Sequence, residues 1–321
     1  MPTRKSTRLR RTRRLLALLI CILIPVVASA QTAADDVLHP LPAELDAYVR
    51  GVMRDWEIPG LAIAVVHGDS VFVGGFGVRR MGSPEAVDVN TVFDAASLTK
   101  SFTATAIGML VDEGRMRWDE PARTYLPQLA FADPYLTANV TVRDLLSHRT
   151  GLAGVNGSWR LTNIDTDEIV RRARFFPAAA PFRTGMVYSN VGYALAGHAA
   201  ASAAGMPWEQ LVTTRILRPL GMNGSTADFD TVESIANRAI PHVLIGGELR
   251  PVRREVGGRD GIAAAGSVQS SAADLARWLR FQLGDGSWRG TRLVSDSVMQ
   301  QLRSPSTIIA TTPAMRAARR V

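Results

Sequence analysis

Apolar positions in the first part of the chain change from helical to strand spacing. From His39 to Trp56 they recur every three or four residues, and Pro42 stands where a first helical turn tolerates proline. After Pro59-Gly60, the runs Leu61–Val66 and Val71–Phe76 have strand character. Turn residues join the two runs, so the pattern predicts a helix followed by an antiparallel hairpin at a sheet edge.

Helical spacing returns in later segments. Residues Ala96 to Glu113 are small or apolar at helical intervals, and Gly114 follows where a C-terminal cap glycine belongs. Thr141 precedes an apolar run and predicts a capped helix start. Ala272 to Leu283 is amphipathic, which predicts a helix with one buried face. We expect that face to contain Leu275, Trp278, Leu279 and Leu283.

The N-terminal segment has the pattern of a secretory signal peptide. Basic side chains precede the apolar run Leu15–Val27, and Ala28-Ser29-Ala30 fits a small-x-small cleavage site. A membrane anchor is less favoured, because the run is shorter than the roughly 20 residues that span a bilayer and contains Pro25. We expect residues 1–30 to be removed and residues 31–321 to be exported to the periplasm or the extracellular space. Membrane contact would then occur only through an uncleaved leader.

The positive charge of the chain is concentrated in this leader. The full sequence of 321 residues carries a formal net charge of +8, and residues 1–30 hold seven basic and no acidic side chains. The remainder has 30 basic against 29 acidic side chains, a net charge of +1. A nucleic-acid partner is therefore not expected. A hydrophobic share of 46% indicates that the remainder can bury a substantial core.

The cysteine and histidine residues do not indicate a nucleophile or a metal site. The single cysteine, Cys21, lies in the leader, so we expect no disulfide and no thiol nucleophile. The histidines lack metal-ligand spacing, and His148 and His198 are expected to satisfy hydrogen bonds in the core or in loops. We predict neither a metal nor another cofactor.

One lysine, Lys100, remains after the leader is removed. Arginine cannot be deprotonated in a protein, whereas a buried lysine can lose its proton and act as a base. In Ser97-Leu98-Thr99-Lys100 the serine and the lysine are three residues apart, so on a helix they share a face. This spacing indicates a serine nucleophile activated by an amine. Drift toward arginine in the composition is the alternative explanation for a single lysine.

Further motifs occur in a fixed order around this pair. They are Ile58-Pro59-Gly60, Phe93 to Lys100, Asp112-Glu113-Gly114, Asp119-Glu120-Pro121, Leu145 to Leu152, Tyr188-Ser189-Asn190 and Ile216 to Met222. Over about residues 40 to 300, this ordered set resembles the class C β-lactamase, penicillin-binding protein and family VIII esterase group of serine hydrolases.

The resemblance implies roles for four residues. Ser97 would be the acylated nucleophile and Lys100 its proton acceptor, while Tyr188 would shuttle the proton and Asn190 would orient the substrate carbonyl. A phenol beside an ammonium can serve both as base and as acid. From the residues alone, Tyr188-Ser189-Asn190 is better explained as a turn in which Asn190 caps a helix and Tyr188 packs.

The resemblance also implies a fold. It is a β-lactamase/transpeptidase-like α/β (α+β) architecture, with an antiparallel sheet flanked by helices and formed by both chain ends. An all-helical subdomain, about residues 114–260, would be inserted, and the active site would lie between the two parts.

One motif of the group is missing. A third motif of the K-T-G or H-x-G kind would follow the helix that Ala272 to Leu283 resembles, and no such sequence occurs there. The strand that carries it supplies one of two backbone donors to the oxyanion, the other being that of Ser97. Loss of one such donor costs about 2.7 to 4 kcal/mol of barrier in other enzymes. The C-terminal strands are therefore expected to be absent, either because the sequence is a piece of a longer product or because the protein is a degenerate relative.

Acyl transfer is the expected activity. Ser97 would attack an ester, amide or lactam carbonyl, and water would release the acyl group. The substrate would be a small molecule or peptide of the peptidoglycan-stem, ester or β-lactam kind, as for an esterase, a D-Ala-D-Ala peptidase or a β-lactamase. The alternatives are a non-catalytic penicillin-binding-like protein and a fragment without a stable fold.

Overall fold

The computed structural model describes residues 37–154, 164–252 and 260–309. All of them belong to a compact unit, Asp36–Val321, which is distinct from the unit Met1–Asp35. The predicted leader and the arginine-containing tail after residue 309 lie outside the described residues. Among the residues that are described, no helix is long and apolar enough to cross a bilayer.

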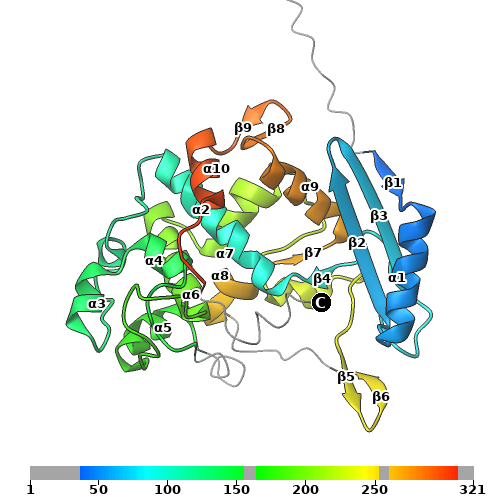
Figure 1. Ribbon diagram of the computed structural model, residues 1–321, viewed down its shortest axis with the longest axis horizontal. Helices are drawn as coiled ribbons and strands as arrows, with labels where there is room; N and C mark the ends of the chain where they lie inside the picture. Colours follow the sequence, from blue (N-terminus) through cyan, green and yellow to red (C-terminus); the bar gives the residue numbers. More distant parts are fainter. Residues whose placement is uncertain (1–36, 155–163, 253–259, 310–321) are drawn as a thin grey trace, which may run out of the picture. The chain divides into compact units, whose positions relative to one another are not determined.

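A three-stranded sheet forms near the start of this unit, as shown in Figure 1. The predicted hairpin is present as β2 (Gly60–His67) and β3 (Ser70–Gly77), which pair antiparallel with His67 opposite Ser70. The predicted first helix is α1 (Ala43–Asp55), which begins after Pro42. The residues before it form β1 (Leu38–Pro40) instead of helix, because prolines at positions 40 and 42 prevent an earlier helical turn.

Alternation along β3 assigns its two faces. Val71 and Val73 point to one face and pack with Ala276 of α9 (Ala272–Leu283). Phe76 points to the other face, where the Arg50 guanidinium of α1 lies 4.9 Å from its ring centroid. The sheet is therefore covered by α9 on one side and by α1 on the other (Figure 1).

The sheet departs from the expected antiparallel pattern at one edge. β1 pairs parallel with β3, which makes the sheet mixed, in the order β1-β3-β2. At the opposite edge, β2 pairs with no further strand among the described residues. Most of β2 is half-buried, which is less than a central strand would show.

Helices and short hairpins make up the rest of the described chain. The longest helices are α2 (Thr99–Asp112) and α6 (Asn190–Ala204), which pack against each other and are largely buried. The shorter helices are α3 (Pro134–Asn139), α4 (Val142–Leu146), α5 (Thr166–Arg172), α7 (Trp208–Val212), α8 (Ala263–Gly266) and α10 (Asp296–Arg303). The short strands pair as β4 (Phe93–Asp94) with β7 (Gln269–Ser270), β5 (His242–Ile245) with β6 (Glu248–Pro251), and β8 (Ser287–Trp288) with β9 (Thr291–Arg292). This mixture of helices and small sheets confirms the predicted α/β fold class. The part predicted to be all-helical, about residues 114–260, is not wholly helical, because the β5–β6 hairpin lies within it.

The buried face of α9 differs from the prediction. Trp278 is buried as expected, but Leu279 and Leu283 are 41% and 69% exposed. The helix approaches the sheet through small residues, among them Ala276. The amphipathic pattern therefore placed the helix correctly along the chain, while the partner that it packs against decided which residues are covered.

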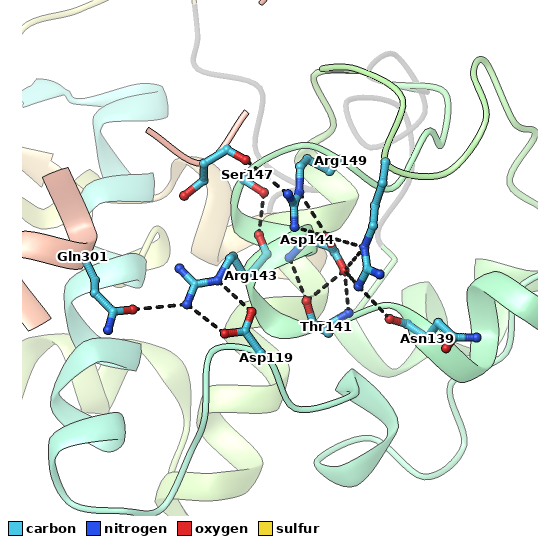
Figure 2. Close-up of polar contacts among 10 residues, drawn as sticks. Asp119, Asn139, Thr141, Arg143, Asp144, Ser147, Arg149 and Gln301 are labelled. Atoms are coloured by element: carbon cyan, nitrogen blue, oxygen red, sulfur yellow. Dashed lines mark hydrogen bonds and ion pairs between the residues drawn. The ribbon is translucent and has the colours of Figure 1, made fainter. Parts of the chain in front are cut away.

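A buried carboxylate, Asp144, holds the loops around α4 together, and Figure 2 shows its surroundings. Its oxygens accept hydrogen bonds from Arg149 Nη2 and Arg183 Nη2, both at 2.6 Å, and from Thr141 Oγ1 at 2.8 Å. Burial alone would raise the pKa of this carboxyl, but the hydrogen bonds outweigh burial and lower the pKa. Thr141 and Asp144 also form a reciprocal capping box, which explains the helix start predicted there.

We expect the substitution Asp144→Asn to lower the free energy of unfolding by about 3 kcal/mol, because asparagine removes the negative charge between the two arginines and replaces one accepting oxygen with an NH2 donor. The effect stays at the lower end of the range for buried ion pairs, since Arg149 and Arg183 keep 26% and 42% exposure. Urea unfolding measures the change. Asp46→Asn is the matched control, since it removes an exposed pair with Arg50 and should leave the urea unfolding midpoint almost unchanged.

The contribution of Asp144 also has a defined pH dependence. Because the folded-state pKa lies below that of an unfolded aspartate, the stabilisation is present at neutral pH and is lost as the pH falls through the folded pKa. If Asp144→Asn and Asp46→Asn lower the free energy of unfolding equally, the Asp144 cluster does not stabilise the fold more than an exposed ion pair does.

Candidate active site

Ser97 and Lys100 lie where a short strand turns into a helix. β4 ends at Asp94, whose Oδ1 accepts a hydrogen bond from the Ala96 backbone N–H at 2.8 Å. Ala96 has φ of +45°, a left-handed conformation that is uncommon for a residue with a side chain. A single 3₁₀ turn, Ala96–Leu98, then leads into α2. Ser97 is exposed at this turn, whereas Lys100 in the first turn of α2 is only 7% exposed.

The structure brings the four predicted site residues together. Lys100 Nζ lies 3.1 Å from Ser97 Oγ and donates to Asn190 Oδ1 at 2.8 Å. Tyr188 Oη lies 2.8 Å from Ser97 Oγ, with either oxygen as donor. Residues about 90 positions apart in the sequence thus meet at one hydroxyl.

A backbone carbonyl completes the surroundings of the amine. Ala265 O accepts a hydrogen bond from Lys100 Nζ at 2.7 Å. A neutral amine has two N–H bonds and one lone pair. Ala265 O and Asn190 Oδ1 are both carbonyl oxygens, so each accepts one N–H bond of the amine. The lone pair of a neutral Lys100 then faces Ser97 Oγ.

The environment of Lys100 acts on its pKa in two directions. Burial lowers the pKa of the ammonium below its ordinary value, and interactions with Tyr188 offset part of this decrease. The Tyr188 and Tyr193 ring centroids lie 5.0 and 5.4 Å from Nζ, where ring faces favour a cation. Burial is the larger effect, so the amine loses its proton more readily than an exposed lysine.

Tyr188 and Asn190 are held at the N-terminus of α6. Ser189 is the N-cap residue and Asn190 is the first residue of the helix, so Asn190 does not itself occupy the cap position. The Ser189 backbone N–H donates to His148 Nδ1 at 3.2 Å. The His148 ring also lies against Tyr188 and Tyr193, with centroids 4.5 and 5.3 Å apart. His148 therefore makes a hydrogen bond in the core, consistent with its expected role, and supports the tyrosine side of the site.

The Asp144 cluster and the site are connected through the loop that contains His148. His148 has φ of +59°, and its carbonyl oxygen accepts from the Val187 backbone N–H at 2.9 Å. One residue later, the Arg149 carbonyl accepts from the Arg183 backbone N–H at 2.9 Å. Asp144 binds the side chains of both arginines. The cluster thus fixes the loop on which His148 and Tyr188 depend.

The segment around α8 contributes to the site in a way that sequence reasoning missed. Besides Ala265 O, it presents Ala264 O, which accepts from Thr103 Oγ1 at 2.7 Å. A Cβ added to Gly197 would lie 2.2 Å from the Ala264 Cβ, so α6 and α8 can approach this closely only with glycine at position 197. The run of small residues at 263–266 was the available indication, but a main-chain acceptor has no side-chain pattern.

Metal ligands are not gathered in the part of the chain that the structure describes. No group of three or more His, Cys, Asp or Glu side chains there could hold an ion. His198 Nε2 instead lies 3.1 Å from Asp167 Oδ1.

The mixed α/β fold and the four-residue site together define the class of β-lactamase-like and penicillin-binding proteins. Residues 45–320 match the Beta-lactamase family model, so the chain belongs to that family. This confirms the resemblance found in the motifs.

Relatives in this family carry hydrolase and penicillin-binding names. The chain is 32% identical over 263 residues to the unguisins hydrolase ungD of Aspergillus violaceofuscus, a match that covers 77% of this chain and 46% of the relative. It is 32% identical to penicillin-binding protein 4 of Amycolatopsis lactamdurans over 74% of this chain and 63% of that protein.

A solved structure has the same fold. It is the octameric penicillin-binding protein homologue from Pyrococcus abyssi, with a TM-score of 0.72, 27% identity, and coverage of 81% of this chain and 59% of that one. The chain spans less than two thirds of the length of each of these three proteins.

His148 should remain neutral through the physiological pH range. Burial, and secondarily the nearby Lys100 charge, lower the pKa of its imidazole to about 4. Between about pH 4 and the ordinary value of 6.5, the unfolded chain binds more protons than the folded chain. The free energy of unfolding should therefore fall as the pH decreases through this window. NMR titration of the histidine Cε1–H resonances, assigned with a His148→Gln variant, measures the midpoint. A midpoint near 6.5 would contradict the placement of the ring.

Proposed function

We propose that this protein is a serine hydrolase that forms an acyl-enzyme at Ser97. The observation that carries the proposal is the position of the Lys100 amine, 3.1 Å from Ser97 Oγ with fixed acceptors for both N–H bonds of its neutral form. Because both N–H bonds of the neutral amine are already used, its lone pair is free to accept the proton of the Ser97 hydroxyl. The lowered pKa of Lys100 supports the same role.

In the acylation step, Lys100 Nζ takes the proton of Ser97 Oγ as that oxygen attacks the substrate carbonyl carbon. The tetrahedral intermediate then collapses, the bond to the leaving group breaks, and the leaving oxygen or nitrogen takes a proton from Tyr188 Oη. The 2.8 Å separation between Tyr188 Oη and Ser97 Oγ supports this transfer. The Lys100 ammonium returns the proton to Tyr188, which leaves the amine neutral.

Deacylation reverses the roles of these groups. A water molecule attacks the ester carbonyl of the acyl-enzyme and gives its proton to the Tyr188–Lys100 pair, and Ser97 Oγ leaves and is protonated again. We propose that Asn190 orients the substrate carbonyl, because its Oδ1 already fixes the amine at 2.8 Å. An ester or amide then gives a carboxylic acid and an alcohol or amine, and a lactam gives one ring-opened amino acid.

The proposed substrates are esters, amides or lactams of small molecules or peptides, including peptidoglycan-stem peptides and β-lactams. Ser97 is exposed and Tyr188 is 40% exposed, which favours an open site over a closed pocket for one small ligand. Names of relatives such as hydrolase, penicillin-binding protein and β-lactamase are compatible with this breadth. Export through the leader, residues 1–30, is part of the proposal.

Intact-mass analysis after incubation with a fluorescent penicillin or a fluorophosphonate tests the nucleophile. We expect one adduct on the wild-type protein and none on Ser97→Ala, because the adduct requires the Ser97 oxygen. Ser234→Ala, which changes an exposed serine away from these contacts, is the matched control and should keep the adduct. If a folded wild-type protein forms no adduct with either reagent, the non-catalytic alternative is correct.

Replacement of Lys100 tests the base. Lys100→Arg keeps a positive charge but cannot lose a proton, so we expect acylation by an activated ester to slow by roughly 10²- to 10⁴-fold. In the wild type, the rate should rise with pH as the amine deprotonates, with a midpoint below the ordinary lysine value of 10.5. Stopped-flow measurement with p-nitrophenyl acetate gives both results. An undiminished rate in Lys100→Arg would falsify the assignment.

A further inference from the structure

The short helix α8 ends after one turn because the N–H groups that would continue it bind elsewhere. Val268 N–H donates to Thr99 Oγ1 of α2 at 3.0 Å, and Gln269 N–H donates to a main-chain carbonyl outside α8 at 2.8 Å. In a continuing helix, these two groups would pair with the carbonyls four residues earlier, those of Ala264 and Ala265. Both carbonyls are therefore left for donors from other elements.

Two side chains of α2 supply these donors. Thr103 Oγ1 donates to Ala264 O at 2.7 Å, and Lys100 Nζ donates to Ala265 O at 2.7 Å. All three polar side chains lie in the first turns of α2, which packs against α8 (Figure 1). Thr99 and Thr103 are fully buried, so water does not replace either hydroxyl. The carbonyl that binds the amine is thus next to a carbonyl that a threonine holds.

We propose that Thr99 and Thr103 are positioning residues for Lys100. Thr99 ends α8, and Thr103 holds the Ala264 carbonyl, so that the adjacent Ala265 carbonyl faces the amine. The inference rests on the proposed role of Lys100 as the base, and it adds the residues that set where this base lies.

This arrangement has a consequence for proton affinity. A carbonyl binds an ammonium more strongly than a neutral amine, because charge strengthens a hydrogen bond. Burial already lowers the pKa of Lys100, so loss of the Ala265 acceptor should lower it further. The titratable side chains that face the amine are Tyr188, Tyr193 and His148, and they are the same in all the variants below.

Carbon-13 NMR of the full chain, labelled at lysine Cε, measures this proton affinity without any acyl chemistry. The sequence contains two lysines, so Lys100→Arg assigns the resonance. Thr103→Val replaces the hydroxyl with a methyl group, and we expect it to lower the titration midpoint of Lys100 by roughly 0.5 pH unit or more. Thr103→Ser keeps the hydroxyl and should retain the wild-type midpoint.

Thr105→Val is the matched control. Thr105 is also buried in α2, but its Oγ1 accepts from Gln282 Nε2 of α9 at 3.1 Å. The substitution should lower the melting temperature, since it removes a buried hydrogen bond, and leave the Lys100 midpoint unchanged. A purely structural role of Thr103 would make the two valine variants alike.

Acylation by p-nitrophenyl acetate, measured above the midpoint, should slow about tenfold in Thr103→Val, because the lone pair is no longer fixed toward Ser97 Oγ. Thr99→Val should also lower the midpoint and serves as the test if Thr103→Val does not fold. The inference is overturned if neither variant lowers the midpoint, or if Thr105→Val lowers it as far. A lowered midpoint in a protein that is never acylated would support the positioning role and contradict the proposed function.

Discussion

The arrangement of this protein around its site depends on one buried amine and the atoms that surround it. Lys100 is largely removed from water, so its nitrogen needs partners within the protein. Asn190 from α6 and the Ala265 carbonyl from α8 supply two of them, and Ser97 supplies the third. Three segments that are distant in the sequence must therefore converge on one nitrogen. Any shift of α6 or α8 relative to α2 would leave the amine unsatisfied or change its proton affinity.

This convergence is possible because small residues lie at the helix contacts. Gly197 allows α6 to touch Ala264 of α8, and a Cβ on Gly192 would lie 2.8 Å from the Leu145 carbonyl of α4. The second contact brings α4, and with it the Asp144 cluster, against the helix that begins with Asn190. The backbone distances at these glycines thus determine the position of the reactive groups. Packing and chemistry are set by the same residues.

Sequence patterns predicted the features that are local. The β2–β3 hairpin was predicted within one residue at each end, because period-two spacing and turn residues act over a few positions. The Ser97–Lys100 spacing likewise placed both groups on one helical turn. The sequence did not predict the three-residue β1, the exposed face of α9 or the Ala265 carbonyl. The first two depend on which elements pack against each other. The third is a main-chain oxygen, which is the same at every residue and leaves no sequence pattern.

The unpaired edge of β2 bears on a different part of the chemistry from Lys100. The partners of the amine come from the 3₁₀ turn that contains Ser97, from α6 and from α8, and among the described residues none comes from the sheet edge. The placement of the Lys100 amine beside Ser97 therefore does not depend on a further strand beside β2. A strand that supplied an oxyanion donor would act later, on the negative charge of the tetrahedral intermediate, where one donor is worth about 2.7 to 4 kcal/mol. A further strand would thus bear on the proposed acylation step, and not on the contacts that place Lys100 beside Ser97.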